Sequence, residues 1–207
     1  MKYWVLDDRD YKLQIAVEDS KAVISNGLVS RTIEFEGCKT SSYQNLQRDT
    51  ELISDGCSDF AVSVNGKKYF GSCFNFIGVQ EVPCVERVPF KRTDTMTKNC
   101  VYPPEGKAVI LKYGNDELNL LVSVRYEIYD GIPVIMKQLT VKNTGTETIT
   151  IDNIYTDILK ITENRDTFLL TAIMILQRIF WVLNCQNTQD IMHGISTIFS
   201  KLPLSSG

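Results

Sequence analysis

Residues 120–152 contain the pattern that most restricts the fold, an alternation of apolar and polar side chains followed by two turn signals. The apolar positions of the first stretch are Leu120, Val122, Val124, Tyr126 and Ile128. A period of two places them on one face of a strand, with that face on a core and the other in water. Asp130-Gly131 then predicts a hairpin with a two-residue type I′ turn.

Two turns in this region give the same register, in which apolar residues face apolar residues. The second turn is Thr144-Gly145-Thr146, and Pro133 is expected beside the first turn, where the following strand stops short of it. The expected pairs are Tyr126–Ile135, Val122–Leu139 and Leu120–Val141 around the first turn, and Val141–Ile149 and Leu139–Ile151 around the second. The segment is therefore predicted to form a three-stranded antiparallel meander.

Similar signals recur through residues 11–162 and predict short strands joined by tight turns. The turns are Glu18-Asp19-Ser20, Asn26-Gly27, Asn65-Gly66 and Gly114-Asn115-Asp116, and the third of them would place Val62 opposite Tyr69. Residues 37–59 and 80–106 are irregular and polar, which predicts long loops. The expected fold is an all-β antiparallel β-sandwich that occupies residues 1–162.

The composition changes near residue 163, after which only six charged side chains remain. The stretch TFLLTAIMILQRIFWVLN is apolar on every side, so residues 163–207 are expected to form an apolar helical tail. Gln177 and Arg178 interrupt the stretch, which argues against a membrane span. Two interpretations stay open: a buried helix packed on the sandwich, or sequence that is not native coding sequence, for instance after a frameshift.

Composition excludes several classes of function. A net charge of −3 gives no electrostatic basis for binding nucleic acid, and the first residues lack the apolar stretch of a secretory signal, so a cytoplasmic protein is expected. Six cysteines without a close pair predict reduced thiols, and His193 is the single histidine. No metal site and no cofactor are therefore expected, and no catalytic residue is assigned.

Aromatic side chains can stack on sugars, and one of them lies in a polar segment. Phe60, Tyr69, Phe74 and Phe76 follow strand patterns, which favours core packing. Tyr43 lies in the polar segment KTSSYQNLQRDTE and is expected to be exposed. Together with its neighbours it forms the candidate carbohydrate contact, which consists of Tyr43, Asn45, Arg48 and Asp49.

Three segments together resemble a known family. ISNGLVSRTIEFEG, FAVSVNGKKYFG and VSVRYEIYDGIPVIMKQLTVKNTGTETITIDNIYTDIL resemble the N-terminal β-sandwich of glycoside hydrolase family 36 α-galactosidases and related large bacterial proteins. The likeness covers roughly residues 11–160, and residues 126–152 are its most specific part. The resemblance implies the wide supersandwich architecture that this family shares with galactose mutarotase.

The resemblance also implies that catalysis and its structural support belong to separate domains. In that family the catalytic aspartates belong to a (β/α)₈ barrel that follows the sandwich; this chain has no barrel, which would need about 250 further residues. The implied function is a non-catalytic N-terminal domain, inactive alone, whose partners are carbohydrate, the missing barrel and, as a homo-oligomer, further copies of the chain. In some members a sandwich loop reaches a neighbouring subunit's sugar site, and Tyr43 to Glu51 is the expected counterpart.

Two other functions are weighed against this one. The first is a free-standing carbohydrate-binding module. The second is a mutarotase-like enzyme, which ranks last because it needs a histidine and a glutamate facing one sugar, and the chain has only His193.

Overall fold

The computed structural model describes residues 9–85 and 104–162, which form an all-β antiparallel structure of three sheets. The strands are β1 (Gln14–Val17), β2 (Lys21–Ser25), β3 (Val29–Glu34), β4 (Lys39–Asn45), β5 (Thr50–Glu51), β6 (Ala61–Val64), β7 (Lys67–Phe70), β8 (Asn75–Val82), β9 (Gly106–Asn115), β10 (Leu120–Tyr129), β11 (Ile132–Asn143) and β12 (Ile151–Tyr155). Among these residues the only helical element is the 3-10 turn η1 (Gly71–Cys73). The expected apolar helical tail, 163–207, lies outside the described residues.

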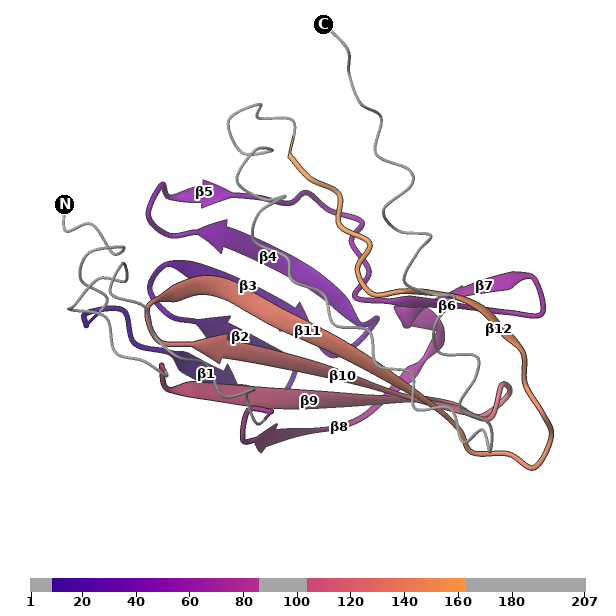
Figure 1. Cartoon of the computed structure of the whole chain (residues 1–207). Helices are drawn as coiled ribbons and strands as arrows, with labels where there is room; N and C mark the ends of the chain where they lie inside the picture. Colours follow the sequence, from indigo (N-terminus) through magenta and orange to yellow (C-terminus); the bar gives the residue numbers. More distant parts are fainter. Residues whose placement is uncertain (1–8, 86–103, 163–207) are drawn as a thin grey trace, which may run out of the picture.

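The sheets form a sandwich around one core. A five-stranded sheet, β1 to β5 in chain order, lies behind a four-stranded sheet in the order β11-β10-β9-β8, and β12-β6-β7 form a third sheet at one end (Figure 1). Buried apolar side chains from all three sheets make one contiguous cluster, which includes Ile24 and Ile33, Phe60 and Val62, and Val124 and Leu139. The expected all-β sandwich is thus confirmed.

The β10–β11 hairpin turns at the predicted residues, but its turn type and its register differ from the prediction. Tyr129 pairs with Ile132, so Asp130-Gly131 forms the tip; φ is positive at Gly131 and not at Asp130, so the turn is not type I′. Ile128 then pairs with Ile135, which leaves Pro133 and Val134 as a bulge inside β11.

Each predicted pair around this turn is wrong by two residues. The observed pairs are Tyr126–Lys137, Val122–Val141 and Leu120–Asn143. Because the shift is an even number, the same side chains still face the core. Pro133 lies within the strand and not beyond its end, and the bulge accommodates its missing N–H.

The predicted third strand of the meander does not pair with β11. Instead β12 pairs with β6, with Ile151 opposite Val64 and Tyr155 opposite Ala61. The preceding loop is tied to the β9–β10 turn, because the N–H of Thr144 donates to the Asn119 carbonyl over 2.8 Å. The chain therefore crosses to another sheet. Alternation predicted an apolar face for this segment but could not specify which strand it joins.

Other local predictions are confirmed or corrected in part. Asn65 and Gly66 both have positive φ, as a type I′ turn requires, and Val62 pairs with Tyr69 as predicted. The segment 37–59 is not one long loop, because it contains β4 and β5. Of the segment 80–106, residues 86–103 lie outside the described part.

Substitution of Gly131 by Val is expected to lower stability by about 1 kcal/mol or more. Gly131 has φ 65°, a region that β-branched residues rarely adopt, and its N–H donates to the Tyr11 carbonyl over 2.9 Å. Thermal melting of Gly131→Val measures the effect. Gly78→Val is the matched control, since a Cβ at Gly78 in β8 would meet nothing within 4 Å. Equal melting temperatures for the two variants would contradict the turn geometry.

Candidate functional site

The candidate carbohydrate contact predicted from sequence is divided by the fold. Tyr43 is 2% exposed and faces the core from β4, so the prediction of an exposed ring is wrong. A register shift in the β3–β4 pairing interrupts strict alternation, and Tyr43 lies opposite Arg31, whose side chain also faces the core. Asn45, Arg48 and Asp49 lie together at the β4–β5 turn, where Asn45 Oδ1 accepts from the backbone N–H groups of Gln47 and Arg48. Carbohydrate contact by these three remains a prediction.

The most unusual group of side chains is an ionic cluster inside the sandwich, formed by Arg31, Asp59, Lys137 and Asp157. Their side chains are 3%, 0%, 1% and 6% exposed, respectively. Arg31 Nη2 lies 3.2 Å from Asp59 Oδ1 and 2.6 Å from Asp157 Oδ1. Lys137 Nζ lies 2.8 Å from Asp157 Oδ1 and 4.0 Å from Asp59 Oδ2. Two cations thus share two carboxylates, and the cluster is formally neutral.

Neutral partners complete the hydrogen bonding of Asp59. Thr40 Oγ1 accepts from Arg31 Nε over 2.9 Å and donates to Asp59 Oδ1. The Tyr126 hydroxyl donates to Asp59 Oδ2, and Lys137 Nζ donates to the backbone carbonyl of the same residue. Arg31 and Lys137 each lie 5.1 Å from the centre of the Tyr126 ring. Such contacts offset part of the cost of removing four charges from water.

The cluster joins distant parts of the chain. Arg31 comes from β3, Asp59 precedes β6, Lys137 comes from β11 and Asp157 follows β12. The cluster was not predicted from the sequence, although a signal exists. Arg31 shares a strand face with Val29 and Ile33, and Lys137 shares one with Ile135 and Leu139. A charge at a core-facing position of an apolar strand requires a buried partner of opposite sign.

Electrostatic interactions favour the charged forms of Arg31 and Asp59. Burial alone would lower the pKa of Arg31, but Asp157 and then other neighbours outweigh burial, and the pKa lies well above its ordinary value. Burial alone would raise the pKa of Asp59, but Lys137 and Arg31, with hydrogen bonds from Thr40 and Tyr126, lower it to about 2. Burial, and next the charge of Asp59, raises the pKa of the Tyr126 hydroxyl well above its ordinary value. None of these three groups has a pKa suited to proton transfer near neutral pH.

Stability is expected to fall as pH drops from about 4 to about 2 because of Asp59. Its pKa in the folded protein is about 2 and its ordinary value is 3.8, so the unfolded chain binds the proton first on acidification. The contribution is present above pH ~4 and amounts to on the order of 2 kcal/mol. Urea unfolding between pH 7 and pH 2 measures it. Asp59→Asn should lose less stability over this range, and an equal loss would contradict the prediction.

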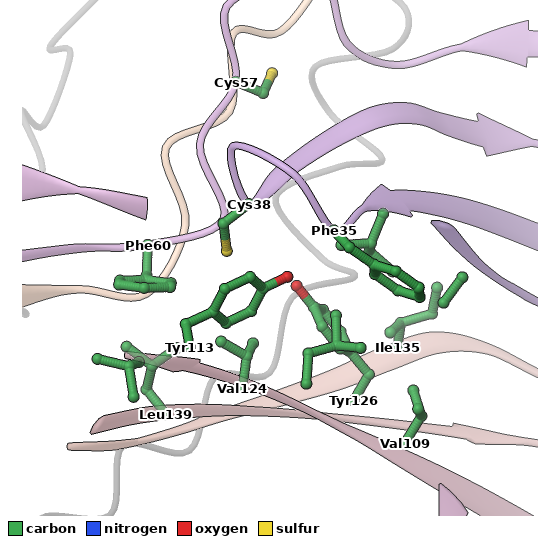
Figure 2. Close-up of a cluster of buried hydrophobic side chains, with 14 of the residues drawn as sticks. Phe35, Cys38, Cys57, Phe60, Val109, Tyr113, Val124, Tyr126, Ile135 and Leu139 are labelled. Atoms are coloured by element: carbon green, nitrogen blue, oxygen red, sulfur yellow. The ribbon is translucent and has the colours of Figure 1, made fainter. Parts of the chain in front are cut away.

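A buried thiol and phenol lie next to the cluster. Figure 2 shows Tyr113 rising from β9 toward the segment that carries Cys38. The Tyr113 hydroxyl is buried without a hydrogen-bond partner among the described residues. Burial, and next the charge of Asp59, raises the pKa of the Cys38 thiol, which is 0% exposed. Because a thiol is nucleophilic only as the thiolate, Cys38 is inert.

Another buried carboxylate, outside the ionic cluster, lies on the opposite face of β10. Glu127 is 3% exposed and accepts from Tyr129 Oη over 2.5 Å, from Arg125 Nε over 2.7 Å and from the Val85 N–H over 3.0 Å. Burial would raise its pKa, but these hydrogen bonds lower it. Glu127 thereby fastens the segment after β8 to the sheet.

Other features of a site are absent from the described part of the chain. In residues 9–85 and 104–162, no three or more His, Cys, Asp or Glu side chains lie in a group that could hold a metal ion. No helix within the same residues is both long enough and apolar enough to cross a membrane. The prediction about His193 falls outside these residues. The expectation that the chain has no cofactor stays a prediction.

Comparison of the chain with protein-family models, with curated proteins and with solved structures found no match. Function must therefore be argued from the arrangement of the residues. The charged side chains of the ionic cluster are at most 6% exposed and pair with each other, so the cluster connects the sheets.

Proposed function

We propose that this chain is a non-catalytic N-terminal domain of an α-galactosidase-like glycoside hydrolase, in which it supports a catalytic barrel. The observation that carries the proposal is the buried ionic cluster. Its four charged side chains are at most 6% exposed, so they bind the sheets to one another and offer no group to a substrate. The class of the parent enzyme is inferred from the family resemblance of residues 11–160.

A rigid sandwich is suited to this role. A support domain must hold its shape under the forces of domain packing, and the cluster connects β3, β11 and the segments that flank β6 and β12. Long strands add to the rigidity, since β9, β10 and β11 contain 10, 10 and 12 residues. A carboxylate pair for glycoside hydrolysis would need to face a cleft. Asp59 and Asp157 instead share Arg31 inside the core.

The purified chain is expected to show no hydrolysis of aryl α-galactosides above a boiled control. The physical reason is that the buried carboxylates cannot reach a glycosidic bond. Turnover that an Asp or Glu substitution within residues 1–207 abolishes would contradict the proposal. The DNA beyond the codon for residue 162, read in all three frames, gives the positive test. A region that encodes a barrel supports the accessory domain.

A free-standing carbohydrate-binding module is the second candidate. It is favoured by a mixed polar and aromatic depression at one end of the sandwich, which contains Tyr69 and Glu117. An unrelated gene directly after this one would favour the module over the accessory domain. Both candidates place the chain in contact with carbohydrate.

A further inference from the structure

Three connections meet at one end of the sandwich. They are the β6–β7 turn at Asn65-Gly66, the β9–β10 turn at residues 116–119, and the β11–β12 loop at residues 144–150 (Figure 1). A depression of about 490 Å³ lies between β7 and the β9–β10 turn, and it also reaches the start of β8. The β4–β5 turn, where sequence analysis placed the candidate contact, lies at the other end (Figure 1).

Hydrogen bonds hold these connections in place. Asn115 Nδ2 donates to the Cys73 carbonyl over 2.7 Å, and Asn115 Oδ1 accepts from the Leu118 N–H over 2.9 Å. The Gly66 N–H donates to Asp152 Oδ2 over 2.6 Å. The backbone of the β9–β10 turn and of the segment before β8 is therefore held in place before any ligand arrives, which reduces the entropy lost on binding.

The side chains that line the depression carry both signs of charge. Lys67, Lys68 and Asn75 supply donors, and Asp116 and Glu117 supply carboxylate acceptors. Among the described residues, neither carboxylate has a side-chain hydrogen bond or an ion pair. Tyr69 contributes a partly buried aromatic ring, which has Lys67 Nζ 4.9 Å from its centre.

This lining selects against simple ions. An anion would lie beside Asp116 and Glu117, and a cation would lie beside Lys67. A neutral molecule with many hydroxyl groups avoids both penalties, because each hydroxyl can donate to a carboxylate and accept from an amine or amide. The Tyr69 ring supplies an apolar surface for the C–H groups of a sugar.

We propose that the depression between Lys67 and Glu117 binds one unit of a neutral glycan. The carbohydrate class agrees with the proposed function and rests on it in part, but the position of the site rests on the lining residues alone. Asp116 and Glu117 accept hydrogen bonds from sugar hydroxyls, Asn75 and Lys67 donate to sugar oxygens, and the ring of Tyr69 contacts one face of the sugar.

Titration of the ¹⁵N-labelled full chain with neutral oligosaccharides tests the site. The probes are raffinose, cellohexaose, xylohexaose and mannohexaose. A shallow site of this kind is expected to give a Kd of about 0.1–10 mM. At least one probe should shift the amide resonances of residues 66–69 and 115–118. The double variant Asp116→Asn, Glu117→Gln keeps the shape and neutralises both acceptors, and it should bind that probe about 10-fold or more weakly.

Glu81→Gln is the matched control, since Glu81 is an exposed carboxylate near the end of β8, away from Asn75 at its start. This variant should bind as the unchanged chain does. Loss of binding in Asp49→Asn with full binding in the double variant would overturn the proposal and favour the contact predicted from sequence. No shift with any of the four probes would also overturn it. Neither result alters the test for a downstream barrel, so the two proposals fail separately.

Discussion

The Asp59→Ala protein is expected to be less stable than the unchanged chain by about 3–5 kcal/mol. Asp59 is 0% exposed and lies between Arg31 and Lys137. Its removal leaves two buried cations with only Asp157 as counter-charge. Thr40 and Tyr126 also lose the acceptor of their hydroxyl groups. An uncompensated buried charge costs far more than a lost surface pair, and this difference sets the magnitude.

Urea unfolding of Asp59→Ala measures the loss, and Glu34→Ala is the control. Glu34 also pairs with a lysine, Lys39, over 2.9 Å, but the two side chains are 38% and 50% exposed. Removal of such a surface pair is expected to change the free energy of unfolding by less than ~1 kcal/mol. Similar effects of the two substitutions would show that the cluster does not fasten the sheets.

A double-mutant cycle separates the charge effect from lost packing. Lys137→Met alone leaves excess negative charge, and Asp59→Leu alone leaves excess positive charge. The combined variant keeps Arg31 with Asp157, which lie 2.6 Å apart and balance each other. It should therefore be more stable than the sum of the single effects predicts, by about 1–3 kcal/mol. Additive effects would mean that electrostatic balance is not what the cluster provides.

A chain that ends at Thr156 is expected to be unfolded or less stable by at least ~3 kcal/mol, whereas a chain that ends at Thr162 should fold. The shorter chain lacks Asp157, which accepts from both Arg31 and Lys137. It also loses backbone pairing to the segment before β6. Those pairs are Ser58 with Ile158, and Ile53 with Ile161, and Thr162 donates to the Leu52 carbonyl.

Comparison of the two truncated chains also tests the interpretation of residues 163–207. If that tail is foreign sequence, the chain that ends at Thr162 should match the full chain in thermal melting and aggregate less, because apolar surface is removed. A loss of several kcal/mol in that chain would show that the tail belongs to the core. Equal stability of the two truncated chains would contradict the role of Asp157.

Local structure is what the sequence determined best. The alternation from Leu120 to Ile128 and the positions of the turns at Asn65-Gly66 and Asp130-Gly131 were predicted correctly, because a strand's face and the place of a turn depend on neighbouring residues. The type I′ geometry predicted for Asp130-Gly131 was wrong, since φ is not positive at Asp130. The sandwich class follows from the recurrence of such units along the chain. These features can be predicted without knowing which strands pair with each other.

Pairing and the interior of the site depended on tertiary structure. The bulge at Pro133-Val134 moved the β10–β11 register by two, and an even shift leaves the apolar pattern unchanged, so the pattern could not reveal it. Tyr43 was expected in water because its neighbours are polar, but the pairing of β4 with β3 placed it opposite Arg31 and on the core.

The buried charges show the difference most clearly. Arg31 and Asp157 are 126 positions apart in the chain, and their contact exists only because β3 and the segment after β12 lie against the same core. The alternation around Arg31 and Lys137 indicates that each faces inward. It cannot indicate which carboxylates form ion pairs with them, because a Coulomb interaction depends on distance in space and not on separation in sequence.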